Sequence, residues 1–78
     1  MDFEITSHAI ERMKKYSISQ DLLKDTLQKP DSVEKSYKER TIYQKKLNGY
    51  VLRVIVEEGK EIKTVVTVYK ARSSRYEI

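Results

Sequence analysis

Cysteine is absent from this chain of 78 residues, glycine occurs twice, and proline and histidine occur once each. Without cysteine the chain can form no disulfide and offers no thiolate to a metal. One imidazole alone cannot build a zinc site, which usually takes four ligands. We therefore expect neither a metal nor another cofactor. Because so short a chain buries only about 60% of its unfolded surface, its core must come from packed helices and strands.

Long apolar runs, internal repeats and flexible linkers are also missing. Residues 1–7 carry two carboxylates and no basic segment, and no hydrophobic stretch follows them. A signal peptide starts with basic residues before an apolar stretch, and a membrane-spanning helix needs about 20 apolar residues. The sequence therefore predicts a cytoplasmic protein without a membrane segment, folded as a single domain over residues 1–78.

Positive charge is in modest excess, with 16 Lys and Arg residues against 12 Asp and Glu residues. The two signs are segregated, because basic residues gather in segments 35–46 and 70–75 and acidic residues in segment 57–61. A segregated positive surface favours a polyanion, and RNA or DNA is the obvious one. The alternative is an ordinary solvated surface, as in most small domains.

The first half of the sequence predicts two helices. Apolar positions recur at helical spacing in residues 8–16, and the hydroxyl of Thr6 or Ser7 can cap the first turn. Ser19 can cap a second helix, whose apolar face carries leucines. This second helix must end at Lys29, because the residue before Pro30 disfavours helical geometry.

After the proline, the apolar residues alternate with a period of two, which indicates strands. Asn48-Gly49 is the strongest turn signal and predicts a type I′ turn. In the last strand we expect Ile62, Val66 and Val68 to point toward the core. The strands are expected at residues 33–37, 40–47, 50–57 and 62–72, with a further short strand at residues 3–5.

These elements predict an α+β fold in which two N-terminal helices pack on a three- to four-stranded antiparallel sheet. The two central strands carry apolar side chains on both faces, so both faces should be at least partly covered. The tail from residue 73 onward is expected to be an extension of the sheet edge or a loose segment.

His8 and Arg12 are four residues apart in the first predicted helix, on a polar flank that also carries Lys15. A neutral imidazole beside a guanidinium suits phosphodiester chemistry. The imidazole takes a proton from the attacking hydroxyl, and the guanidinium stabilises the developing negative charge. The alternative is that His8 is a surface residue that donates to a local carbonyl group.

Arg53 interrupts the apolar residues Val51 and Ile55 on one face of a predicted central strand. A charge there must be paired or must face a cleft, because burying it alone costs several kcal/mol, on the order of 3–5. A structural role would pair Arg53 with Glu11 or Asp25 on a covering helix. A functional role would aim it at a substrate.

The C-terminal segment combines cations with tyrosines, at Tyr69, Lys70, Arg72, Arg75 and Tyr76. Cations hold phosphates, and aromatic rings can stack on unpaired bases. The strand tyrosines Tyr37, Tyr43 and Tyr50 could extend this surface, although most such residues are simply half-buried in a sheet with a solvated hydroxyl.

Several strings of residues point to a known family. They are the run from Ile5 to Met13 with His8, Ala9 and Arg12, then Tyr16, Ile18 and Ser19, then Gln28-Lys29-Pro30, Leu52-Arg53-Val54-Ile55-Val56, and Thr67-Val68-Tyr69 with Arg72. Together they resemble a family of small bacterial and archaeal proteins, domain of unknown function 4258, whose members begin with an "HAxxRM" helix and end on a "TVY" strand. That family in turn resembles a distant branch of the RelE/ParE/BrnT-type toxin superfamily.

The resemblance implies a RelE-like fold and a toxin that acts as a metal-independent endoribonuclease on RNA, with ribosome-bound mRNA as one candidate substrate. It also implies that a small antitoxin protein neutralises the toxin. It implies catalytic roles for His8, Arg12, Arg53, Tyr69 and Arg72. It implies substrate binding by Lys15, Lys70, Arg75 and Tyr76. A non-catalytic module that binds nucleic acid or protein on the same fold remains the alternative.

Overall fold

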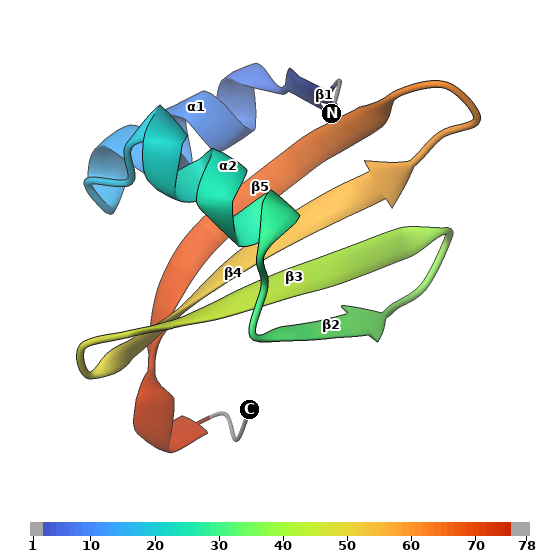
Figure 1. The fold of residues 1–78 in the computed structure, drawn as a ribbon. Coiled ribbons are helices and arrows are strands. Elements are labelled where there is room, and N and C mark those ends of the chain that lie inside the picture. Colours follow the sequence, from blue (N-terminus) through green and yellow to red (C-terminus); the bar gives the residue numbers. More distant parts are fainter. Residues whose placement is uncertain (1–2, 76–78) are drawn as a thin grey trace.

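The protein folds as one five-stranded sheet with two helices on one face (Figure 1), in a computed structural model that describes residues 3–75. Neither helix within this range has the length and apolar character needed to cross a membrane. The elements in chain order are β1 (Phe3–Ile5), α1 (Ser7–Lys15), α2 (Gln20–Gln28), β2 (Ser32–Lys35), β3 (Arg40–Leu47), β4 (Tyr50–Glu58), β5 (Lys63–Arg72) and the 3₁₀ turn η1 (Ser73–Arg75).

Helix α1 begins at a threonine that also joins the helix to the sheet. The Thr6 hydroxyl accepts a hydrogen bond from the Ala9 amide at 3.1 Å and donates one to the Val66 carbonyl at 2.9 Å. The Thr6 amide donates to the Val65 carbonyl at 3.1 Å. Thr6 therefore satisfies one of the free amides of the first helical turn and fixes the start of α1 beside β5.

Helix α1 ends in a Schellman motif, in which a residue just past the helix takes the left-handed conformation. The Ile18 amide donates to the Met13 carbonyl at 2.8 Å, and the Ser17 amide donates to the Lys14 carbonyl at 3.3 Å. Ser17 has a φ of 55°, a value that glycine adopts more easily than serine. Ile18 and Met13 are both buried in the core, which is the apolar contact that usually accompanies this motif.

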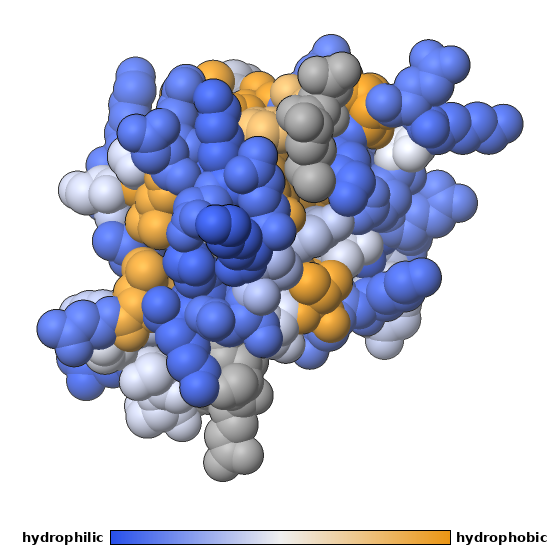
Figure 2. Space-filling model, in the orientation of Figure 1, coloured by the Kyte–Doolittle hydropathy of each residue, from blue (hydrophilic) through white to orange (hydrophobic). Residues whose placement is uncertain are grey.

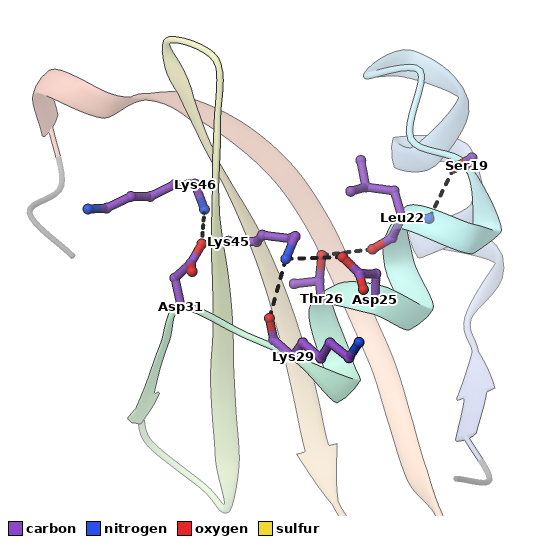
Figure 3. Close-up of polar contacts among 8 residues, drawn as sticks. All are labelled: Ser19, Leu22, Asp25, Thr26, Lys29, Asp31, Lys45 and Lys46. Atoms are coloured by element: carbon purple, nitrogen blue, oxygen red, sulfur yellow. Dashed lines mark hydrogen bonds and ion pairs between the residues drawn. The ribbon is translucent and has the colours of Figure 1, made fainter.

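The expected cap of α2 is confirmed, and the last helical residue lies one position before the expected Lys29, which is the C-cap. The Ser19 hydroxyl accepts from the Leu22 amide at 3.1 Å, and the helix ends at Gln28, before the proline. Lys45 of β3 then fixes the helix to the sheet, because its ammonium pairs with Asp25 at 3.0 Å and donates to the Lys29 carbonyl at 3.3 Å (Figure 3). The sheet and α2 are thus joined by charged contacts at the rim of the apolar core.

The prediction of a three- to four-stranded antiparallel sheet is wrong. The sheet has five strands in the order β1-β5-β4-β3-β2 and is mixed, because β1 pairs with β5 in parallel while the other neighbours are antiparallel. The physical reason is the connection after β1. Both helices follow β1 and cover one face of the sheet, and the chain then forms the antiparallel strands β2 to β5. The last strand, β5, lies beside β1 and runs in the same direction.

A β-bulge in β5 changes which side chains face the core. Ile55 pairs with Thr67 but the next residue of β4, Val56, pairs with Val65, so Val66 is the extra residue. As a result Val65 and Val68 are fully buried, whereas Val66 is only partly buried and Ile62 lies outside the strand and is exposed. The expected inward set of Ile62, Val66 and Val68 is therefore right only for Val68.

The core fills the space between the helices and one face of the sheet. It contains Ala9, Met13, Ile18, Leu23, Leu27, Tyr43, Leu52, Val54, Val56, Val65 and Val68. Each fully buried aliphatic side chain in this set contributes about 1.5–3 kcal/mol. On the surface seen from the direction of Figure 1, hydrophilic side chains predominate and hydrophobic atoms show in separate patches (Figure 2).

The turns differ in detail from the sequence prediction. Asn48-Gly49 does join β3 to β4, but only Gly49 has a positive φ, 78°, so the expected type I′ turn is wrong. The two successive positive φ values that such a turn needs occur instead at Lys38 and Glu39, 55° and 61°, between β2 and β3. The Arg40 amide closes that turn by donating to the Tyr37 carbonyl at 3.1 Å.

Candidate nucleic-acid interface

One exposed flank of α1 carries three of the residues expected to handle RNA. His8, Arg12 and Lys15 follow one another at intervals of four and three residues, which places them along one side of a helix. His8 and Lys15 are exposed and Arg12 is half-buried. The buried residues Ala9 and Met13 occupy the adjoining flank, against the sheet. In the described part of the chain none of the three forms an ion pair.

The end of β5 adds two cations on the same side of the sheet. Lys70 pairs across the ladder with Leu52, a core residue that faces the helices, and Arg72 lies two residues further along the same face. Helix α1 packs on β5. We call the set formed by His8, Arg12, Lys15, Lys70 and Arg72 the helix-side basic surface.

Arg53 and Tyr69 lie on the other face of the sheet. They are cross-strand partners, and the Arg53 guanidinium lies 5.7 Å from the centroid of the Tyr69 ring. Their neighbours along each strand, Leu52, Val54 and Val68, face the helices, and side chains alternate along a strand. The sheet therefore separates Arg53 and Tyr69 from His8 and Arg12, and the structure does not bring the expected site residues into one cluster.

Arg53 is paired, as the structural alternative required, but not with a helix. Its guanidinium lies 3.1 Å from a carboxylate oxygen of Glu34 on β2, and Arg53 is only 7% exposed. The expected partners Glu11 and Asp25 lie on the helix side, and Asp25 pairs with Lys45 instead. Arg53 thus connects the central strand β4 to the edge strand β2 across the intervening Gln44 of β3.

The last two expected residues lie at the C-terminal end. Arg75 is the final residue of η1, which follows β5 directly, and the Ser73 amide donates to the Gly49 carbonyl at 3.2 Å. This bond joins η1 to the turn between β3 and β4. Tyr76 lies outside the residues that the structure describes.

A polar cluster that sequence reasoning missed lies on the helix side, near the other end of β5. The Tyr43 hydroxyl donates to Glu58 at 2.9 Å and accepts from the Lys63 ammonium at 2.8 Å. The hydrogen bond to Tyr43, reinforced by the nearby Glu58 carboxylate, raises the pKa of Lys63 above its usual value. Tyr43 lies 15 residues before Glu58 and 20 before Lys63, and the register of three adjacent strands brings the three side chains together.

The described residues contain no group of three or more histidine or carboxylate side chains placed to hold a metal ion. What the helix-side basic surface does offer is one exposed imidazole and four cationic side chains. Such a surface can bind phosphate groups by charge and hydrogen bonding.

Comparison with curated proteins and with solved structures gave no significant match. A family model does match, over residues 5–70. That range includes α1, α2 and β2 to β4, together with most of β5. The chain therefore belongs to the family described as "Domain of unknown function (DUF4258)".

Proposed function

We propose that this protein acts on RNA through the helix-side basic surface, as a metal-independent endoribonuclease and the toxin of a toxin–antitoxin pair. The observation that carries the proposal is the flank of α1, where an exposed imidazole at His8 is followed by Arg12 and Lys15, none of them ion-paired within residues 3–75. The choice of RNA rests on the resemblance to RelE-like toxins that we inferred from the sequence alone.

The proposed reaction uses the 2′-hydroxyl of RNA as the nucleophile. His8 takes the 2′-hydroxyl proton, the 2′ oxygen attacks the adjacent phosphorus, and the bond to the 5′ oxygen of the next nucleotide breaks. The imidazolium returns the proton to that departing oxygen. The products are a 2′,3′-cyclic phosphate and a free 5′-hydroxyl. Arg12 stabilises the extra negative charge on the phosphorane oxygens, and Lys15, Lys70 and Arg72 hold neighbouring phosphates.

Arg53 and Tyr69 have no direct part in this proposal, because the sheet lies between them and His8. Arg53 contributes by holding β2 to the sheet through Glu34. This gives the proposal a discriminating consequence. A substitution of His8 should abolish cleavage in a folded protein, whereas a substitution of Arg53 should act through stability.

Cleavage is tested with the purified full chain on matched RNA and all-DNA oligonucleotides, with a His8→Ala variant as control. The wild type should cleave RNA only, in the presence of a chelator, and leave cyclic phosphate ends. Loss of a general base lowers the rate by about 10²–10⁴-fold. Equal RNA cleavage by wild type and His8→Ala would show contaminating nuclease and refute the proposal.

A second function, non-catalytic binding, is favoured by one specific observation. The His8 side chain makes no hydrogen bond with any other residue in the described part of the chain, whereas a catalytic base is commonly oriented by a third group. On this alternative the same surface binds RNA or an acidic protein without cutting it. Expression in a host separates the two. Growth arrest that requires His8 and is relieved by a neighbouring small gene supports the toxin, and RNA binding without arrest or cleavage supports the module.

A further inference from the structure

A groove beside α1 is lined by four apolar and four polar residues and lies apart from the helix-side basic surface. It has a volume of about 430 Å³ and is lined by Ile5, Ile10, Met13, Lys14, Ser17, Ile18, Ser19 and Gln20. Ile10 is 43% exposed although it belongs to a helix whose other exposed residues are polar. A volume of this size accommodates several side chains.

The charge of the lining has one sign. Lys14 is its only charged residue, no carboxylate contributes to it, and Lys14 forms no ion pair within residues 3–75. The other polar residues of the lining are uncharged hydroxyls and one amide. An occupant with apolar side chains and a carboxylate opposite Lys14 would therefore be complementary to the groove.

An open strand edge adjoins the groove through Ile5. Among the described strands β1 is at an edge of the sheet. The Thr6 amide donates to the Val65 carbonyl, and in a parallel ladder alternate residues face the same neighbour. The backbone amide and carbonyl of Glu4 therefore also point toward β5. Those of Phe3 and Ile5 point away from β5, to the open edge. An added strand could bond to them.

We propose that this edge and groove form the docking site for an extended acidic segment of a partner protein. The segment adds to β1 by backbone hydrogen bonds, as in β-augmentation. Every second side chain of an added strand lies on the helix side of the sheet, so an aliphatic side chain beside Ile5 enters the groove and contacts Ile10. A carboxylate of the segment pairs with Lys14. The site is independent of the RNA proposal, because it uses the flank of α1 that His8 and Arg12 do not occupy.

The test begins with a display library of random twelve-residue peptides selected on the full-length protein. The most enriched peptide is then synthesised and its affinity measured by fluorescence anisotropy. We expect peptides in which aliphatic residues alternate with carboxylates. Ile10→Glu and Lys14→Glu should each weaken binding by about tenfold or more, while Lys24→Glu, the same charge reversal at an exposed site on α2, should leave it unchanged.

Two further measurements make the outcome decisive. Replacing the peptide's carboxylate with lysine should restore binding to Lys14→Glu and not to Ile10→Glu, and thermal unfolding checks that each variant is folded. The proposal is overturned if no peptide is enriched, if enriched peptides lack acidic residues, or if they bind Ile10→Glu as well as the wild type. It is also overturned if sedimentation shows a dimer that Ile10→Glu dissociates, because a second copy would then occupy the groove.

Discussion

Replacing Ser17 with glycine should stabilise the protein. Ser17 is the left-handed residue of the Schellman motif that ends α1, with a φ of 55°. For a residue with a Cβ atom this conformation costs about 1–2 kcal/mol, because the Cβ approaches the following carbonyl oxygen. Glycine lacks that contact. The substitution leaves the two hydrogen bonds of the motif in place, because both are donated by backbone amides and glycine keeps its backbone amide.

The expected gain is smaller than the full conformational cost. Glycine also gives the unfolded chain more freedom, which lowers stability by about 0.5–1 kcal/mol. The Ser17 side chain is exposed, so little packing is lost. The difference leaves a net stabilisation of about 0.5–1 kcal/mol. For a domain of this size, 1 kcal/mol corresponds to about 4–8 °C in the melting temperature.

The change is measurable by urea denaturation and by thermal unfolding followed by circular dichroism. The matched control is Ser19→Gly, the same substitution two residues later. Ser19 has an extended backbone with φ −77°, and its hydroxyl caps α2. Loss of that cap should lower stability by a few tenths of a kcal/mol, roughly. The two serines should therefore respond with opposite signs.

A neutral or destabilising Ser17→Gly, with Ser19→Gly behaving as expected, would contradict this prediction. That result would mean that the left-handed conformation at Ser17 costs nothing, so the strain assigned to this turn would be absent. A Ser17→Ala variant completes the set, because it keeps the Cβ atom and should show none of the gain.

Three other substitutions test separate parts of the fold. Thr6→Val keeps the shape of the side chain but removes both hydrogen bonds of the Thr6 hydroxyl. It should lower the free energy of unfolding, measured by urea denaturation, by about 1–2 kcal/mol. A smaller loss would contradict the role of Thr6 as the cap of α1. Gly49→Asn should be nearly neutral, because asparagine tolerates a positive φ. Gly59→Asn should cost about 1–3 kcal/mol, since a Cβ atom at this position would lie 2.5 Å from the backbone carbonyl oxygen of Ile62. Equal effects of the two substitutions would refute this steric difference. The hydrogen bond from Lys63 to Tyr43 raises the pKa of Lys63, so its contribution is complete below the unfolded-state pKa of about 10.4 and is lost as pH rises through the higher folded value. Denaturation at increasing pH above about 10 should show this loss in the wild type and lack it in Lys63→Met.

Local signals in the sequence were sufficient for most of the elements. Hydroxyl caps, a proline and helical spacing located α1 and α2, and Asn48-Gly49 located the turn between β3 and β4. The strand β1 was expected, but its pairing was not. Its partner lies about sixty residues later in the chain, and three residues carry no pattern that specifies parallel or antiparallel pairing. The bulge at Val66 was hidden for a similar reason, because it depends on the register between β4 and β5.

The candidate site was predictable only within single elements. Helical spacing correctly placed His8, Arg12 and Lys15 on one flank of α1. Strand alternation placed Arg53 on the opposite face of β4 from Leu52 and Val54. It did not indicate which of the two faces the helices cover. That choice depends on how the chain crosses the sheet after β1. It decides that Lys70 shares a side with α1 while Arg53 and Tyr69 do not.

The most direct test of the proposed RNA surface is the salt dependence of binding to a single-stranded RNA oligonucleotide. Each phosphate contact contributes about −0.7 to the slope of the logarithm of the affinity against the logarithm of the salt concentration. Arg12→Ala should therefore reduce the magnitude of the slope by about 0.7 and weaken binding, and Arg72→Ala should do the same. Lys60→Ala, which removes an exposed cation from the turn between β4 and β5, should change neither. An affinity that does not depend on salt, or a slope that Lys60→Ala lowers as much as Arg12→Ala does, would contradict the account.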